Sequence, residues 1–125
     1  MTEGLSGEAV RVAVAGEVAV VTPPAEVDVL NSVMLREVLL AALGEHATVV
    51  ADMTTNVFCD STGLQALVIA HRSRAGGELR VAVDHTHLRR IFKVTGVNKV
   101  LRVFDTVADA ISAPPAGPRA TPGVS

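Results

Sequence analysis

The chain has 125 residues, one cysteine and no tryptophan or tyrosine, and 49% of its residues are hydrophobic. This length fits one domain with its own core, and a single cysteine excludes an internal disulfide framework and any CxxC zinc or redox motif. No apolar run reaches the roughly 18 residues that a membrane span needs. The N-terminus has no basic segment before its first apolar stretch, so we expect no signal peptide and a cytoplasmic protein.

The charge is divided unevenly along the chain. Residues 1–60 carry nine acidic and two basic side chains, whereas residues 61–125 carry four acidic and nine basic ones, so that the net charge is −2. A basic half can bind nucleic acid. The net charge is negative, however, and the chain has no aromatic platform on which bases could stack, so we expect no direct contact with nucleic acid.

The first elements are predicted to form a β-hairpin. Apolar residues alternate with others over residues 10–14, which is typical of a half-buried strand. A second apolar run over residues 18–21 follows Gly16-Glu17, and glycine at the first position of a two-residue connection favours a tight hairpin turn.

A helix is predicted next, over residues 28–43. Asp28 is a suitable N-cap and Gly44 a suitable C-cap. Its apolar residues recur at helical spacing and predict a buried stripe. The stripe consists of Leu30, Met34, Val38 and Ala41, with Leu35, Leu39 and Ala42 beside it.

The remaining elements follow from the same criteria. We expect a central strand over residues 48–53, a loop over 54–59, a helix over 61–75, a strand over 79–83, a helix over 88–95, a strand over 100–103, and a last helix that Asp105 or Thr106 caps. Strands that alternate with helices predict a mostly parallel sheet. The expected fold is therefore α/β, in the order ββαβαβαβα, with the N-terminal hairpin as an antiparallel edge. Residues 1–112 form the predicted domain, and residues 113–125, rich in Pro, Gly and Ala, are predicted to be a disordered tail.

Motifs for catalysis, for cofactor binding and for metal binding are missing from the chain. There is no phosphate-binding loop, dinucleotide fingerprint, zinc-protease motif or serine-hydrolase motif. His85 and His87 lack a third ligand nearby in the sequence, and Ser61 lies roughly 15 Å along one helix from His71, too far for proton transfer. Cys59 has an apolar setting, which favours a small buried thiol. We therefore expect no enzyme, no cofactor and no metal.

The most informative segment is Asp60-Ser61-Thr62-Gly63-Leu64, where a loop enters a helix. Capping by Asp60 or Ser61 accounts for one polar residue. Gly63 costs roughly 1 kcal/mol relative to Ala inside a helix, which indicates that another group approaches the helix start closely. An exposed serine hydroxyl at a helix N-terminus is a favourable place for a phosphate, because the helix dipole and the free N–H groups stabilise its charge.

In this strand and helix order, these residues resemble the STAS domain, and most closely the small bacterial anti-sigma factor antagonists. The resemblance covers about residues 8–112 and implies the STAS fold. The segments that carry it are Val50-Ala51-Asp52-Met53, Phe58 to Leu64, Leu88-Arg89-Arg90-Ile91-Phe92, Thr95-Gly96-Val97 and Val100-Leu101.

The resemblance implies a phosphorylation switch. The unphosphorylated chain would bind an anti-sigma factor, which is also a serine kinase that uses ATP, and would thereby release a sigma factor. Phosphorylation of Ser61, with Thr62 as a secondary candidate, would abolish binding, and a serine phosphatase would reverse it. The family's acidic pair near the first helix is matched by Glu26 and Asp28, with Ala25 in place of a glycine. The expected partner-binding residues are Glu26, Asp28, Asp60, Ser61, Thr62, Gly63 and Leu64.

We expect the chain to be a monomer or a weak dimer with no membrane contact. An alternative function within the same fold is a soluble STAS subunit of a lipid-transport ABC system, where the chain would brace the ATPase.

Overall fold

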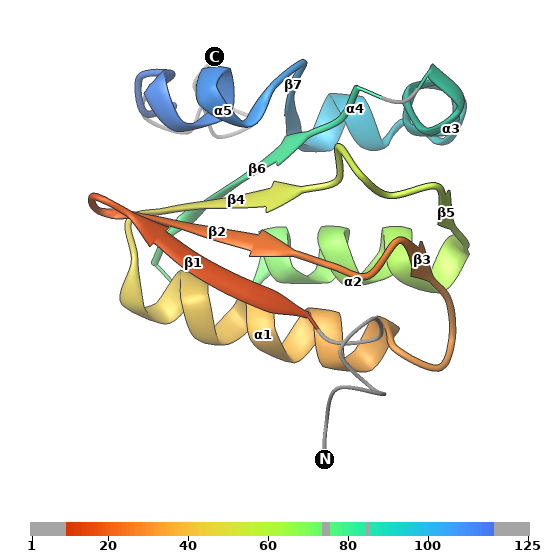
Figure 1. The fold of residues 1–125 in the computed structure, drawn as a ribbon, viewed down its shortest axis with the longest axis horizontal. Helices are drawn as coiled ribbons and strands as arrows, with labels where there is room; N and C mark the ends of the chain where they lie inside the picture. Colours follow the sequence, from red (N-terminus) through yellow and green to blue (C-terminus); the bar gives the residue numbers. More distant parts are fainter. Residues whose placement is uncertain (1–9, 74–75, 85, 117–125) are drawn as a thin grey trace, which may run out of the picture.

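A five-stranded sheet forms the centre of the computed structural model (Figure 1), which describes residues 10–73, 76–84 and 86–116. In sheet order the strands are β1 (Arg11–Ala15), β2 (Val18–Thr22), β4 (Thr48–Asp52), β6 (Glu78–Ala82) and β7 (Arg102–Phe104). β1 pairs with β2 antiparallel, and every other pair of neighbours in this sheet is parallel. The predicted α/β fold, with a mostly parallel sheet and a hairpin at its edge, is confirmed.

The helices cover both faces of this sheet. Figure 1 shows α1 (Ser32–Glu45) and α2 (Ser61–Arg72) side by side along one face, and α5 (Val107–Ser112) on the other. α3 (Thr86–Thr95) and the short α4 (Val97–Val100) connect β6 to β7, and their apolar residues join the main core beneath α1 and α2. A smaller core lies under α5, around Val50, Ala82 and Ala110.

A second, two-stranded sheet lies outside the main one. β3 (Glu26–Val27) pairs in parallel with β5 (Phe58–Cys59). The expectation that residues 54–59 form only a loop is therefore wrong, because their last two residues are a strand. Two residues are too few to show a period, so neither strand could be found from the sequence pattern.

The first helix begins later than predicted. Its N-cap is Asn31, so the prediction that Asp28 caps it is wrong. The Asp28 carboxylate instead accepts a hydrogen bond from the backbone N–H of Leu30, 2.9 Å away, as Asp side chains often do in turns. At the other end Gly44 lies within α1 and His46 is the C-cap, so Gly44 is not the cap.

The buried face of α1 agrees with the prediction only in part. Leu35, Leu39 and Ala42 face the core as expected, whereas Leu30 is 89% exposed and Met34 is 51% exposed. The predicted stripe through Leu30 and Met34 is therefore wrong. The exposed residues lie near the start of α1, close to the second sheet.

Three smaller differences concern strands and helix ends. β1 is exposed along its whole length rather than half-buried, because it is the edge strand. Residues 97–100 are helical, so the last strand begins at Arg102 and not at residue 100. α2 ends at Arg72; residues 74–75 lie outside the described part. Thr106 caps α5 by accepting from the N–H of Asp109, as predicted.

The first residues of the predicted tail are attached to the sheet. The carbonyl oxygen of Pro114 accepts hydrogen bonds from Arg80 at 3.1 Å and from Arg102 at 2.9 Å. The N–H of Ala116 donates to Glu78, 3.3 Å away. Residues 1–9 lie outside the described part of the chain, and so do residues 117–125, which make up the rest of the predicted tail.

Candidate functional site

The start of α2 is capped by Asp60. Its carboxylate accepts from the backbone N–H of Thr62 at 2.9 Å and of Gly63 at 3.2 Å, and from the Thr62 hydroxyl at 2.5 Å. The Thr62 hydroxyl is the main reason why the pKa of Asp60 lies below its ordinary value. Burial opposes this effect, and the N–H groups of Gly63 and Thr62 lower the pKa further. Of the two predicted candidates, Asp60 and Ser61, Asp60 is therefore the N-cap of α2.

Ser61 is the first residue of α2 and is exposed. Within the described part of the chain, its hydroxyl has no hydrogen-bond partner. Thr62 differs, because it is half-buried and its hydroxyl is held by Asp60. The stability of the helix start thus requires Asp60 and uses the Thr62 hydroxyl, while the Ser61 hydroxyl is left available to solvent.

Gly63 is required by close packing beneath the helix start. A Cβ at this position would lie 2.5 Å from Sγ of Cys59 and 2.7 Å from Cγ1 of Val27. The expectation that a neighbouring group approaches Gly63 closely is confirmed, and the neighbours are β3 and β5. Gly63 and Leu64 are both buried, so they contribute little exposed area to the surface around Ser61.

The pairing of β3 with β5 brings two distant acidic segments together. Glu26 lies opposite Phe58, and the N–H of Asp60 donates to the carbonyl of Val27 at 3.1 Å. Because both strands run in the same direction, Asp28 and Asp60 follow them at the same end. The structure therefore places Glu26 and Asp28 beside the start of α2.

Exposed apolar side chains surround this acidic region, and the sequence interpretation missed them. A groove of about 190 Å³ between α1 and α2 is lined by Val29, Val33 and Ile69 together with Thr62. A second groove, of about 290 Å³, lies between α2 and the segment around Thr95 and Val97, and Ser61 lies on its edge. Leu30 and Phe58 add further exposed apolar surface. The one signal in the sequence was that α1 has more apolar residues than one buried face can hold.

Cys59 is buried, and burial together with the nearby Asp60 charge raises the pKa of its thiol to about 12. The thiol is thus a packing group, as expected. The described residues include no cluster of three or more His, Cys, Asp or Glu that could hold a metal ion; His85 lies outside them. No helix in the described part of the chain is long and apolar enough to cross a membrane.

Residues 9–110 match the family model of the STAS domain. No curated protein matches the chain.

Several solved structures share the fold. An anti-sigma factor antagonist from Mycobacterium paratuberculosis has a TM-score of 0.75 at 23% identity, over 83% of this chain and 91% of that one. The Bacillus cell fate determinant SpoIIAA in its phosphorylated form has a TM-score of 0.62 at 20% identity, over 82% and 96%. The murine anion transporter Slc26a9 has a TM-score of 0.62 at 22% identity, over 79% of this chain and 18% of the transporter.

Proposed function

Because the chain belongs to the STAS domain family, we propose that it is an anti-sigma factor antagonist whose binding is switched off by phosphorylation of Ser61. The observation that carries this proposal is the division of roles at the start of α2. Asp60 accounts for the cap, and the Ser61 hydroxyl is exposed with no hydrogen bond to a described residue. Two solved proteins of similar fold, one named an anti-sigma factor antagonist and one solved in a phosphorylated form, support the proposal.

In the unphosphorylated state, the anti-sigma factor binds at the start of α2 and a sigma factor is released. The polar contacts come from Glu26, Asp28, Asp60, Ser61 and Thr62. Exposed apolar side chains such as Leu30 and Phe58 supply area that is removed from water on binding. Buried Gly63 and Leu64 hold this surface in shape and contribute indirectly.

Phosphorylation acts through charge. A phosphate on Ser61 adds about −1.5 to −2 charges at pH 7. The N–H groups of Thr62 and Gly63 already serve the Asp60 carboxylate. A partner bound at the start of α2 would therefore bury the phosphate beside a like charge. Like charges brought together in an interface cost several kcal/mol, and about 5.5 kcal/mol moves an equilibrium from 1:99 to 99:1. One phosphate is therefore large enough to switch binding.

Ser61 is the first site and Thr62 the secondary one. A kinase needs a hydroxyl that it can reach, and the Ser61 hydroxyl is exposed. The Thr62 hydroxyl is half-buried and donates to Asp60 at 2.5 Å, so its phosphorylation would first have to break part of the cap.

The remaining chemistry belongs to other proteins. The anti-sigma factor is a serine kinase and brings ATP, and a serine phosphatase removes the phosphate. This chain supplies no catalytic group, cofactor or metal, contacts neither nucleic acid nor membrane directly, and works in the cytoplasm as a monomer or weak dimer.

Affinity purification from native cytoplasm tests the proposal, with wild type, Ser61→Ala, Ser61→Asp and the control Ser112→Asp as baits. Ser112 is exposed at the end of α5, on the other face of the sheet. We expect wild type, Ser61→Ala and Ser112→Asp to retain a serine kinase that Ser61→Asp loses. With ATP, the kinase should phosphorylate wild type and leave Ser61→Ala unmodified.

Two outcomes would contradict the proposal. Equal retention by Ser61→Asp and wild type would exclude the charge mechanism. An ABC ATPase bound equally by all four baits would support the alternative function in lipid transport, with Ser61 as an ordinary surface residue.

A further inference from the structure

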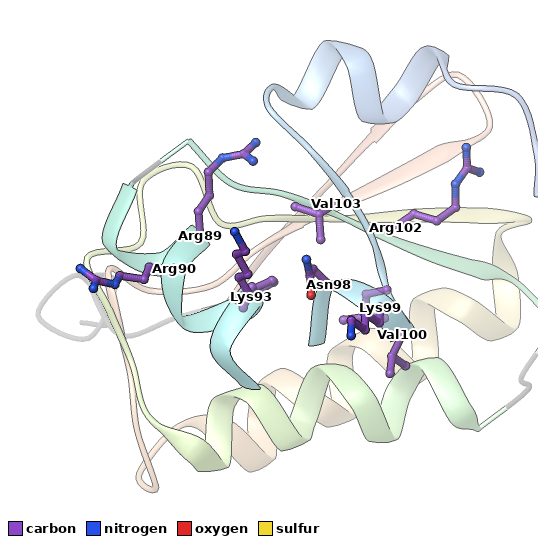
Figure 2. Close-up of a pocket in the computed structure, with 10 residues that line it drawn as sticks. Arg89, Arg90, Lys93, Asn98, Lys99, Val100, Arg102 and Val103 are labelled. Atoms are coloured by element: carbon purple, nitrogen blue, oxygen red, sulfur yellow. The ribbon is translucent and has the colours of Figure 1, made fainter. Parts of the chain in front are cut away.

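A groove of about 770 Å³ lies between α3, α4 and β7 (Figure 2). It shares no lining residue with the two grooves beside the start of α2. Its role is therefore not explained by the proposed switch at Ser61 and does not depend on that switch.

The side chains around this groove carry a concentrated positive charge. Five of the chain's eleven basic residues line it, and they include both of its lysines: Arg89, Arg90, Lys93, Lys99 and Arg102. None of the described residues that line the groove is acidic. A surface of one charge sign attracts ligands of the opposite sign.

Part of this charge has no ionic partner. Arg89 pairs with Asp105, and Arg102 pairs with Glu78 at 2.8 Å. Arg90, Lys93 and Lys99 are exposed and form no salt bridge with any residue in the described part of the chain. These three cations are therefore available to a ligand.

The arrangement of the cations favours an extended ligand. Figure 2 shows Arg89 and Arg90 at one end of the groove and Arg102 at the other, with Lys93 and Lys99 between them. The charged groups are spread along the groove and do not converge on one point, as they would around a single phosphate.

The floor of the groove is apolar and favours a peptide over a nucleic acid. Phe92 and Leu101 are buried there, and Val100 and Val103 offer apolar surface between the cations. Phe92 is 1% exposed, so its ring cannot stack on a base. A peptide that combines carboxylates with aliphatic side chains would match both the floor and the rim.

We propose that this groove binds an acidic segment of a partner protein that also carries aliphatic side chains. Carboxylates of the segment pair with Arg90, Lys93 and Lys99, while its aliphatic side chains pack on Val100 and Val103.

Fluorescence anisotropy with the full chain and a fluorescein-labelled peptide of repeated Glu-Glu-Leu tests this binding. We expect saturable binding that weakens with added NaCl, because the screening length falls from about 10 Å at 0.1 M to about 3 Å at 1 M. Lys93→Gln with Lys99→Gln should weaken binding by about tenfold or more. Arg11→Gln with Arg72→Gln removes the same charge from exposed positions that do not line the groove and should stay within about twofold of wild type.

The place of binding is read from amide chemical shifts of the isotope-labelled chain. Shifts confined to α3, α4 and β7 would support the proposal, and shifts centred on the start of α2 would overturn it. Equal affinity for a Gln-Gln-Leu peptide would also overturn it, since charge would then be irrelevant. Displacement of the peptide by a lower concentration of an oligothymidine or of inorganic phosphate would assign the groove to a nucleic acid or to a small anion.

Discussion

Gly63 and Cys59 are packed so closely that a Cβ on Gly63 would lie 2.5 Å from Sγ of Cys59. The same Cβ would lie 2.7 Å from the Val27 side chain, so it would meet both strands of the small sheet. The glycine is therefore what allows α2 to begin directly against β3 and β5.

Gly63→Ala should destabilise the fold. Overpacking of this kind costs about 1–3 kcal/mol, which exceeds the gain of roughly 1 kcal/mol in helix propensity. Gly44→Ala is the matched control, because Gly44 is exposed in α1 and a Cβ there would meet nothing within 4 Å. Chemical denaturation should show Gly63→Ala below wild type and Gly44→Ala at or above it. The packing argument fails if both variants are equally stable.

The thiol of Cys59 should be inert in the folded chain. Burial and the Asp60 charge raise its pKa to about 12, so only about one molecule in 10,000 carries a thiolate at pH 8. Iodoacetamide should leave the native chain unmodified at pH 8 and should modify it in denaturant, as mass spectrometry would show. A native chain that reacts as fast as free glutathione would contradict the buried position.

Leu30 should matter for binding and not for stability. It is 89% exposed, so Leu30→Ala should change the free energy of unfolding by less than about 0.5 kcal/mol. If the anti-sigma factor covers this side chain, the same variant should weaken binding about tenfold or more. Val14→Ala, at an exposed position on β1, is the control and should bind normally. Isothermal titration calorimetry with the purified partner would measure the affinity of both variants. Undiminished binding by Leu30→Ala would show that Leu30 lies outside the interface.

Glu78 should make stability depend on pH. Burial alone would raise its pKa, but hydrogen bonds from Arg102, Arg80 and the N–H of Ala116 outweigh burial and hold the pKa below its ordinary value of 4.5. A carboxylate with a lowered folded pKa stabilises the fold above its unfolded pKa, and this contribution is lost as the pH falls through the folded pKa.

Glu78→Gln should therefore lower the free energy of unfolding by roughly 1–3 kcal/mol at pH 7. The difference from wild type should shrink as the pH falls from about 6 to about 3. Glu37→Gln is the control, because Glu37 forms an exposed pair with Arg36 that contributes about 1 kcal/mol or less. If the difference in unfolding free energy between wild type and Glu78→Gln is independent of pH, the charge of Glu78 does not stabilise the fold through Arg80 and Arg102.

The main sheet and the longer helices could be predicted from the sequence because each has a local pattern with clear boundaries. The predicted bounds of β4 and β6 agree with the structure to within one residue at each end. The cap of α2 was predictable as well, since Asp60 or Ser61 had to satisfy the free N–H groups of the first turn.

The small sheet and the start of α1 could not be predicted, because tertiary contacts decide them. Asn31 and Asp28 are equally suitable as N-caps by residue type. The side chain of Asn31 decides between them, because it bridges the N–H of Asp28 and the carbonyl of Glu26. These contacts hold the segment before the helix in a turn, and Leu30 is exposed as a result. The basic groove was visible only as a run of positive charge, because its shape depends on where β7 returns to the sheet.

The pairing of β3 with β5 joins segments that are far apart in the chain; Asn56 hydrogen-bonds to the carbonyl of Pro24, 32 residues earlier. Closing so long a loop is costly in chain entropy and becomes worthwhile only when the elements between the two segments have packed. The acidic residues and Ser61 are therefore separate in a nascent or partly folded chain and come together only on completion of the fold. A partner that recognises these residues together would therefore bind folded chains and not incompletely folded ones.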